Sequence, residues 1–205
     1  MIAPQGSAEW LAARAGCLTA SAIADMIAKT KTGEAASRAN LRARLVAERL
    51  TGVPQDSFSN AAMQWGNEQE PFARAAYEIQ SGNLVDQVGI VMHPRIPYAG
   101  ASPDGLIDEC GLVEIKCPNT ATHIEYLLSG TPPKKYQPQM LWQMECTGRQ
   151  WCDFVSFDPR MPEHLQLFVV RFERDEERLD DLRKEAIAFL AEVDALILQL
   201  TKKAA

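Results

Sequence analysis

Long apolar runs are missing from this 205-residue sequence, since no stretch reaches the roughly 18 residues that a membrane-spanning helix needs. Residues 1–5 also lack the basic and then apolar pattern of a secretion signal. We therefore expect a soluble protein of the cytoplasm with no membrane partner. A glycine-rich phosphate loop and a serine or histidine nucleophile motif are missing as well, which argues against an ordinary metabolic α/β enzyme.

Cysteine pairs and histidine clusters are absent too. The five cysteines are an odd number without Cys-x-x-Cys spacing, which argues against a disulfide framework and against a zinc or iron–sulfur site. Reduced thiols are therefore expected. The three histidines, His93, His123 and His164, follow no metal-ligand spacing, so we place them in loops or on the surface, without a catalytic role.

An excess of positive charge is also lacking, because the formal net charge is −6, whereas phosphate-binding proteins usually carry a basic surface. Much of the acid is local, however: residues 173–181 hold six acidic side chains where a helix is expected to begin. The basic residues gather elsewhere, at Arg14, Lys29, Lys31, Arg38, Arg42, Arg44, Arg49, Lys134 and Lys135. The charge count is compatible with an enclosed basic surface and an acidic exterior.

Two carboxylates and a lysine are expected to meet within residues 102–118. Pro103, Asp104 and Gly105 carry turn chemistry, and the alternating run 112–116 predicts a strand, so the segment predicts a hairpin. Successive side chains of a strand face opposite ways, which puts Glu114 and Lys116 on one side. Asp104 begins the connection that returns into this strand, so its carboxylate is expected beside that of Glu114.

Asp104, Glu114 and Lys116 together are suited to metal-assisted hydrolysis. Two carboxylates, a backbone carbonyl and waters form the oxygen shell that Mg²⁺ prefers. A metal held in this way orients a water nucleophile and offsets charge on a phosphate oxygen, and a nearby lysine can hold or help deprotonate that water. The structural alternative is that Pro-Asp-Gly is an ordinary turn and Glu-x-Lys an ordinary charge pair.

Pro103-Asp104 followed by Glu114-x-Lys116 matches the signature of the PD-(D/E)xK nuclease superfamily. Further segments resemble one branch of it, the phage lambda exonuclease and its viral recombinase relatives, and they keep their order from about residue 9 to residue 175. These segments are Gly-Cys-Leu-Thr-Ala-Ser at 16–21, Trp-Gly-Asn-Glu-Gln-Glu at 65–70, Ser-Pro-Asp-Gly at 102–105, Glu-Ile-Lys-Cys-Pro at 114–118, Phe-Asp-Pro-Arg-Met at 157–161, and Tyr136 with Gln139.

The resemblance implies a set of catalytic residues, namely Asp104, Glu114, Lys116, Gln139 and Glu70. Among them Asp104, Glu114 and Glu70, with the main-chain carbonyl of Ile115, would hold Mg²⁺, for which Mn²⁺ can substitute. Lys116 would position and activate the attacking water, and the amide of Gln139 would orient it. The relatives often carry a second glutamine two positions after Gln139, and here Leu141 stands in its place.

The resemblance also implies five contacts to DNA, made by Arg14, Ser21, Lys31, Met63 and Ser102. A forked guanidinium at Arg14 suits the phosphate at a DNA end, and Met63 would lie near the DNA entrance as a wedge between bases. Structural alternatives stay open at this point. Arg14 can be a solvated helix-end residue, Ser21 a helix cap, Lys31 part of a loop that joins helices, and Met63 a core residue.

The activity implied by the resemblance is a processive, Mg²⁺-dependent 5′-to-3′ digestion of one strand of linear duplex DNA. It would leave 3′ overhangs for phage-type recombination by strand annealing. The implied partners are duplex DNA ends, a single-strand annealing protein and two further copies in a homotrimeric ring, within the cytoplasm of a bacterial host cell. Two alternatives remain: an endonuclease or resolvase on the same fold, which Arg14→Ala would leave unharmed, and a non-catalytic DNA-binding or docking scaffold for an annealing protein.

The predicted elements give an α/β fold of the restriction-endonuclease type, a single domain with a mixed central sheet flanked by helices. We expect N-terminal helices within 7–82, a catalytic sheet core at 83–172 and a C-terminal helix at 175–201. Predicted helices cover a short segment after Ser7 and residues 19–28, 37–50, 60–80, 121–128, 136–147 and 175–200; predicted strands cover 84–92, 98–101, 112–117, 151–157 and 165–172.

Four further expectations concern these helices. Thr19 or Ser21 caps the second helix, and Pro71 interrupts or kinks the fourth. The arginines of residues 37–50 form a solvated face, and the apolar stripe of the last helix packs on the sheet.

Overall fold

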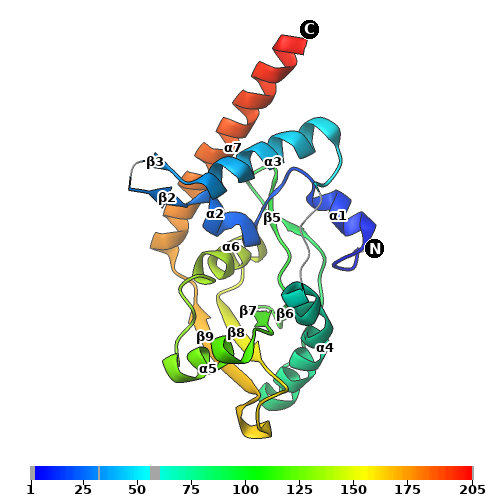
Figure 1. Cartoon of the computed structure of the whole chain (residues 1–205), viewed down its shortest axis with the longest axis vertical. Helices are drawn as coiled ribbons and strands as arrows, with labels where there is room; N and C mark the ends of the chain where they lie inside the picture. Colours follow the sequence, from blue (N-terminus) through cyan, green and yellow to red (C-terminus); the bar gives the residue numbers. More distant parts are fainter. Residues whose placement is uncertain (1–2, 32, 56–60, 205) are drawn as a thin grey trace.

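The structure is a computed structural model that describes residues 3–31, 33–55 and 61–204 (Figure 1). The helices are α1 (Ala8–Arg14), α2 (Ile23–Met26), α3 (Ala36–Thr51), α4 (Ala61–Ser81), α5 (Thr120–Ser129), α6 (Gln137–Thr147) and α7 (Glu176–Ala204), with 3-10 turns η1 (Ala20–Ala22) and η2 (Glu163–Leu165). The strands are β1 (Leu18–Thr19), β2 (Lys29–Thr30), β3 (Gly33–Glu34), β4 (Val91–Met92), β5 (Ala99–Ala101), β6 (Gly105–Ile107), β7 (Gly111–Lys116), β8 (Trp151–Phe157) and β9 (Leu167–Glu173).

The central sheet has the strand order β6-β7-β8-β9. β7 and β8 run parallel, whereas β6 with β7 and β8 with β9 are antiparallel, so the sheet is mixed. A parallel pair needs a crossover, and here α5 and α6 lie between β7 and β8 in the chain. The predicted fold class, an α/β fold with a mixed central sheet flanked by helices, is confirmed.

The two faces of the central strands bury different residues because side chains alternate along each strand. Val113 and Ile115 of β7 belong to a core cluster with Ala73 and Tyr77 of α4, so α4 covers that face. Leu112 of β7 belongs to the second, larger cluster together with residues of α6 and α7. Glu114 and Lys116 therefore emerge on the face that α6 covers.

The predicted strand 84–92 is largely wrong. Only Val91–Met92 forms a strand, and Asp86 makes a single bridge to Leu106 through two 2.9 Å backbone hydrogen bonds. The ladder stays short because its partner β6 has only three residues. β4 and β5 also lie outside the central sheet, since they form a separate three-stranded sheet with β1.

Two helix predictions need correction as well. α4 continues through Pro71 as one helix, so the predicted interruption is wrong, while the alternative of a kink stays a prediction. The helix is held on the sheet by the buried Ala73 and by the Tyr77 hydroxyl, which donates to Asp153 over 2.7 Å. Its predicted start at Asn60 lies outside the described residues. The hydroxyl of Thr19 makes no cap hydrogen bond to η1 and instead lies 3.3 Å from that of Ser21.

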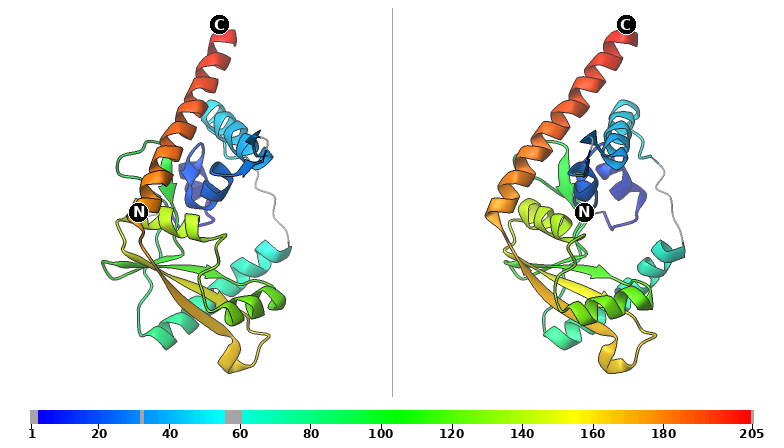
Figure 2. Two further views of the ribbon diagram at one scale, coloured as in Figure 1. Left: turned by 90° about the vertical axis from the view of Figure 1, so that its left-hand side faces the viewer. Right: turned by 60° about the vertical axis from the view of Figure 1, so that its left-hand side comes forward.

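The apolar stripe of α7 packs against helices rather than on the sheet. Leu179, Phe189 and Val193 are buried, chiefly against α3, α6 and α2, whereas Leu200 is 46% exposed. The last turns of α7 extend beyond the rest of the chain in all three views (Figures 1 and 2). None of the helices in the described residues has the length and hydropathy of a membrane span.

The arginine face of α3 is not simply solvated. Arg38 and Arg42 both reach Glu192 of α7 and Glu34, with N···O distances of 2.5–2.7 Å, and Arg49 pairs with Asp194 of α7 at 2.7 Å. These ion pairs hold α3 against α7. The periodicity of the sequence located the face, and Glu34 is close in sequence, but Glu192 lies about 150 residues away and carries no local signal.

His123 is buried within α5, contrary to the prediction, whereas His93 lies in a loop as predicted but is buried there; the five cysteines are free as expected. His123 contacts the Ser156 hydroxyl at 2.7 Å and the Leu165 carbonyl at 2.8 Å. Nδ1 of His93 accepts hydrogen bonds from the backbone N–H groups of Arg95 and Ile96, each over 3.0 Å.

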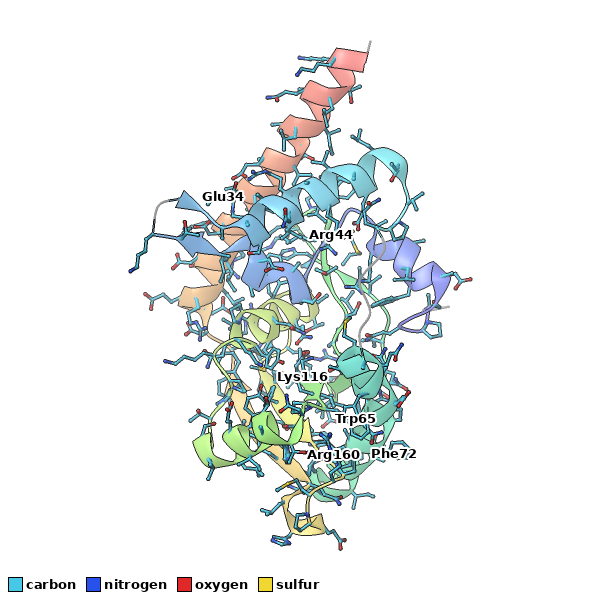
Figure 3. The ribbon with its side chains drawn as sticks, in the orientation of Figure 1. Glu34, Arg44, Trp65, Phe72, Lys116 and Arg160 are labelled. Atoms are coloured by element: carbon cyan, nitrogen blue, oxygen red, sulfur yellow. The ribbon has the colours of Figure 1, made fainter. Side chains whose placement is uncertain are left out.

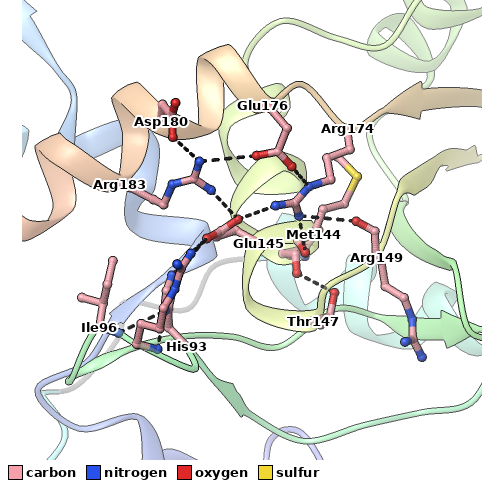
Figure 4. A network of polar contacts seen from close by, with 12 residues as sticks. His93, Ile96, Met144, Glu145, Thr147, Arg149, Arg174, Glu176, Asp180 and Arg183 are labelled. Carbon is pink, nitrogen blue, oxygen red and sulfur yellow. Dashed lines mark hydrogen bonds and ion pairs between the residues drawn. The ribbon is translucent and has the colours of Figure 1, made fainter.

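His93 also lies beside a buried carboxylate network at the C-terminal end of α6 (Figure 4). Glu145 accepts from Arg174 at 2.5 Å and from Arg183 at 2.9 Å, and His93 Nε2 lies 3.4 Å away. Burial disfavours the charged carboxylate, but the hydrogen bonds from both arginines outweigh this and lower the pKa of Glu145. The network ties α6 to α7 and to the segment between β4 and β5.

Glu145→Gln is expected to lower the free energy of unfolding by about 2–3 kcal/mol at pH 7. This is less than the roughly 3–5 kcal/mol of a fully buried pair, because both arginines are partly exposed. The folded-state pKa lies below the ordinary value, so the stabilisation is present above that value and is lost as the pH falls through the folded pKa. Urea unfolding of the parent and of Glu145→Gln at several pH values measures this difference in the free energy of unfolding.

The control is Glu176→Gln, because Glu176 contacts the same two arginines from an exposed position. We expect Glu176→Gln to lower the free energy of unfolding much less than Glu145→Gln does. A Glu145→Gln variant that is as stable as the parent at pH 7, or whose deficit grows on acidification, would contradict the assignment.

Candidate active site

One cleft of about 950 Å³ gathers nearly all of the residues singled out in the sequence. In Figure 3, Lys116 lies centrally, below α3 and above Arg160. The predicted site residues that line the cleft are Arg14, Ser21, Met63, Glu70, Ser102, Asp104, Ile115, Lys116 and Gln139. The N-terminal segment, α4, the β6–β7 hairpin and α6 thus bring together residues that are up to 125 positions apart in sequence, from Arg14 to Gln139.

Two predicted site residues are not among those that line the cleft. Glu114 is fully buried, in contact with the lining residues Lys116 and Gln139, whereas Lys31 lies away from the cleft. It is exposed in the turn between β2 and β3 and is not among the lining residues. Lys29 of the same hairpin pairs with Glu185 of α7 at 2.9 Å, which holds the hairpin to that helix. A short basic loop gives no indication of which neighbour it will pack against.

Asp104 is positioned by the hairpin that the sequence predicts. Gly105 pairs with Val113 in the antiparallel β6–β7 ladder, and Asp104 Oδ2 accepts a 2.6 Å hydrogen bond from the backbone N–H of Ile115. Burial and the nearby charge of Glu114 raise the pKa of Asp104 to about 8. Asp104 thus sits against the backbone of β7 next to Glu114, where a second negative charge is disfavoured.

Glu114 is fully buried and has three polar partners. Lys116 forms an ion pair with its Oε1, Gln139 Nε2 donates to the same oxygen over 2.6 Å, and Gln143 Nε2 donates to Oε2 over 2.6 Å. Burial alone would lower the pKa of Lys116, but the carboxylates of Glu114 and Asp104 raise it overall. Both oxygens of Glu114 are therefore fixed by neighbours.

Gln143 is a site residue that the sequence reasoning missed. It lies four residues after Gln139 on α6, and residues at this spacing share one face of a helix. Leu141, at the position where relatives carry a second glutamine, is buried in the large core cluster instead. The helical spacing was the available signal, but it does not show which face meets Glu114.

Glu70 lines the cleft, but its carboxylate is engaged by Arg74, one helical turn later, at 2.5 Å. Within the described residues, no three Asp, Glu, His or Cys side chains are arranged to hold a metal ion by themselves. Of the predicted ligands, Asp104 and Glu114 are brought together, because Asp104 accepts from the N–H of Ile115, the residue next to Glu114 in β7. A buried carboxyl that keeps its proton up to a pKa of about 8 is one whose charge a cation would stabilise, so the pair fits a divalent cation.

Arg14 lines the cleft and is held there by contacts with Trp10 and Thr19. Its guanidinium stacks 4.0 Å from the ring centre of Trp10, and Nη2 donates to the Thr19 hydroxyl over 3.5 Å. It makes no ion pair with any described carboxylate, and its buried Nε has no hydrogen-bond partner there. Trp10 is in turn fixed by donating its indole N–H to Ser102 over 3.0 Å. Arg14 is thus a half-buried cation on the cleft wall that forms no ion pair with a described residue.

Two further lining residues, Trp65 and Arg160, belong to segments that carried the resemblance but were given no role in the site. The guanidinium of Arg160 lies 4.7 Å from the ring centre of Trp65, and its Nε donates to the fully buried Asp158 over 2.7 Å (Figure 3). Arg160 also donates to the Pro118 carbonyl over 3.0 Å, so it joins the end of the motif strand to α4.

The mixed sheet, with Asp104, Glu114 and Lys116 at one end of its hairpin, defines a protein of the PD-(D/E)xK nuclease superfamily. The family described as the YqaJ-like viral recombinase domain matches residues 9–150. The chain belongs to this family, which is related to lambda exonuclease, as the resemblance implied.

Two solved structures illustrate the relationship. The chain is 52% identical to LHK-Exo, an alkaline exonuclease from Laribacter hongkongensis, with 97% of this chain and 98% of that chain covered and a TM-score of 0.90. One LHK-Exo structure is a complex with dAMP. A phage-related exonuclease from Haemophilus somnus 129PT is 16% identical, with 90% and 96% covered and a TM-score of 0.69, and shows the fold alone. The comparison with curated proteins gave no match.

Proposed function

We propose that this chain is a Mg²⁺-dependent exonuclease that digests one strand of linear duplex DNA from its 5′ end and leaves a 3′ overhang. The observation that carries this proposal is one cleft lined by Asp104, by Lys116, which pairs with the buried Glu114, and by Arg14, which forms no ion pair with a described carboxylate. The cluster supplies hydrolytic chemistry, and the guanidinium supplies a grip for a terminal phosphate. The 52% identical relative is an alkaline exonuclease, which supports the same class of reaction.

The residues of the cluster have separable roles. Asp104, Glu114 and the Ile115 carbonyl would hold Mg²⁺, or Mn²⁺ in its place, with Glu70 contributing if it exchanges Arg74 for the cation. The cation, when bound, supplies the positive charge that stabilises a phosphate oxygen and acidifies water. Lys116 holds the attacking water by hydrogen bonding, and its ammonium lies beside the position where negative charge develops.

Gln139 and Gln143 position Glu114. Their amides donate to its two different oxygens, so together they fix the orientation of a buried carboxylate. The expectation that Gln139 orients water rests on the resemblance, whereas the amide observed here donates to Glu114. Both functions are compatible if the amide shifts when a substrate enters.

Gln143→Leu is expected to reduce the cleavage rate about 10–100-fold, the usual cost of losing a residue that orients a metal ligand. Leucine keeps the bulk of the side chain but removes the hydrogen bond to Glu114. We expect more Mg²⁺ to be needed for half-maximal activity, because the ligand is less well held. Cleavage rates in a Mg²⁺ titration measure both effects.

The control for this variant is Gln137→Leu on the same helix, because Gln137 donates to the Pro132 carbonyl, and does not contact Glu114. If Gln143→Leu matches the parent in both rate and Mg²⁺ requirement, the positioning role is wrong.

The proposed function is tested with linear duplex labelled at either the 5′ or the 3′ end, alongside covalently closed circles, in Mg²⁺ and in EDTA. Mg²⁺-dependent release of the 5′ label with the circles intact is the expected result. Cutting of closed circles would favour the endonuclease alternative. Absence of cleavage in every substrate would favour the scaffold alternative.

The assembly is a proposal that rests on the family resemblance. A ring of three copies would enclose the duplex, and a single-strand annealing protein would receive the 3′ overhang. Sedimentation of the isolated chain tests the ring, with a mass near three times 22.7 kDa expected. A monomer at all concentrations would contradict it.

A further inference from the structure

A second, smaller groove adjoins the active-site cleft. It has a volume of about 400 Å³ and lies between α2 and α3. Ser21 lines both the groove and the cleft, so the two hollows meet at this residue. The groove is lined by Ser21, Ala22, Asp25, Ser37, Asn40, Leu41 and Arg44. In Figure 3, Arg44 lies on α3, above Lys116.

Arg44 differs from the other arginines of α3. Arg38, Arg42 and Arg49 are each paired with carboxylates, whereas Arg44 is exposed and makes no ion pair with any described residue. Its charge is felt at Arg14, whose pKa is lowered by burial and then by the positive charge of Arg44. Arg44 lines the groove and Arg14 lines the cleft, and the two hollows share Ser21, so two guanidinium groups without an ion pair to a described carboxylate flank this junction in a chain whose net charge is −6.

The groove lining suits a sugar–phosphate backbone. Ser21, Ser37 and Asn40 offer neutral hydrogen-bonding groups around the guanidinium of Arg44. None of the described lining residues is aromatic, so the groove has no platform on which bases could stack. Binding through phosphates alone is independent of sequence, as digestion of arbitrary DNA requires.

We propose that this groove binds the phosphates of the single-stranded 3′ tail of the uncut strand. The inference rests on the proposed function, in which the cut strand ends at the 5′ phosphate held by Arg14. Beyond that phosphate, only the uncut strand continues, as a single strand. Each round of cleavage lengthens this single-stranded tail by one nucleotide. The groove is continuous with the cleft at Ser21, whose hydroxyl lies 3.3 Å from that of Thr19, to which Arg14 donates, and none of Asp104, Glu114 and Lys116 lines it.

Asp25 allows a second, independent test of the proposal, because it places a negative charge in the same groove. It is exposed and forms no ion pair with any described residue. A phosphate in the groove is attracted by Arg44 and repelled by Asp25. Removing these two charges should therefore shift the affinity for a tail in opposite directions, which a merely structural role of either residue would not do.

The test measures binding in EDTA, so that no strand is cut. One duplex is prepared blunt, with a ten-nucleotide 3′ tail or with a ten-nucleotide 5′ tail, and dissociation constants are read from fluorescence anisotropy. We expect the parent to bind the 3′-tailed duplex about tenfold more tightly than the blunt duplex. Arg44→Ala should lose this gain and leave blunt binding unchanged, and Asp25→Asn should increase the gain.

Lys184→Ala is the matched control, because it removes an exposed positive charge on α7 and should leave the gain intact. For the 3′-tailed duplex, Arg44→Ala should also reduce the slope of log affinity against log salt by about 0.7.

Three results would overturn the inference: no preference of the parent for a 3′ tail, the same preference in Arg44→Ala, or an equal Arg44-dependent gain from a 5′ tail. A weaker tail affinity in Asp25→Asn would overturn it too. Failure of the proposed function is seen separately, as absence of Mg²⁺-dependent release of the 5′ label from blunt duplex by the parent.

Discussion

Asp104→Asn is expected to reduce nucleotide release from duplex DNA by about 10³-fold or more, comparable to the loss of a major electrostatic stabiliser at an active site. Asparagine keeps the size of the side chain, and its carbonyl oxygen can still accept the 2.6 Å hydrogen bond from the Ile115 N–H. The negative charge that attracts a divalent cation is lost, however. The fold and the affinity for DNA should therefore be preserved.

Single-turnover cleavage at saturating DNA, with anisotropy binding in parallel, measures this prediction. Asp108→Asn is the matched control, because Asp108 is exposed in the turn of the same hairpin and has a positive φ of 44°, which asparagine tolerates. The control should keep full activity. Full activity in Asp104→Asn would remove this residue from the site.

Lys116→Ala is expected to lower the single-turnover rate by about 10²-fold or more. The substitution removes the ion pair with Glu114 and the ammonium that lies 5.3 Å from the ring centre of Tyr136. It leaves a buried carboxylate with the two glutamine amides as its only described partners. DNA should still bind, because Arg14 and the rest of the cleft are unchanged.

Lys135→Ala provides the comparison, since Lys135 lines the same cleft and lies 4.8 Å from the ring centre of Tyr136 but does not contact Glu114. We expect it to weaken DNA binding modestly while the rate at saturating DNA stays near that of the parent. Equal loss of rate in both variants would indicate that positive charge in the cleft, rather than the contact to Glu114, is what matters.

The motif strand was predictable because its signals are local. Alternation along residues 112–116 fixed which side chains share a face, and the turn residues around Asp104 fixed the hairpin that brings this carboxylate to the Ile115 N–H. The same alternation put Val113 and Ile115 on the opposite side of the strand, and in the structure α4 covers that side. Long helices with one apolar stripe, α3 and α7, were also found from periodicity.

The errors arose where a partner from far along the chain decides the outcome. Residues 84–92 have the composition of a strand, but β6 offers only three residues to pair with. The arginines of α3 find their carboxylates on α7, and Gln143 reaches Glu114 only because α6 crosses that face of β7. Such contacts depend on tertiary packing, which a single sequence does not encode in any local pattern.

The most direct test of the central claim is the release of mononucleotides from 5′-labelled linear duplex as Mg²⁺ is titrated, for the parent chain and for Asp104→Asn at equal DNA occupancy. We predict Mg²⁺-dependent release by the parent, none in EDTA, and a loss of about 10³-fold in the variant. Release that persists in EDTA, or that proceeds at the parental rate without the Asp104 carboxylate, would contradict the assignment of this cluster as the catalytic site.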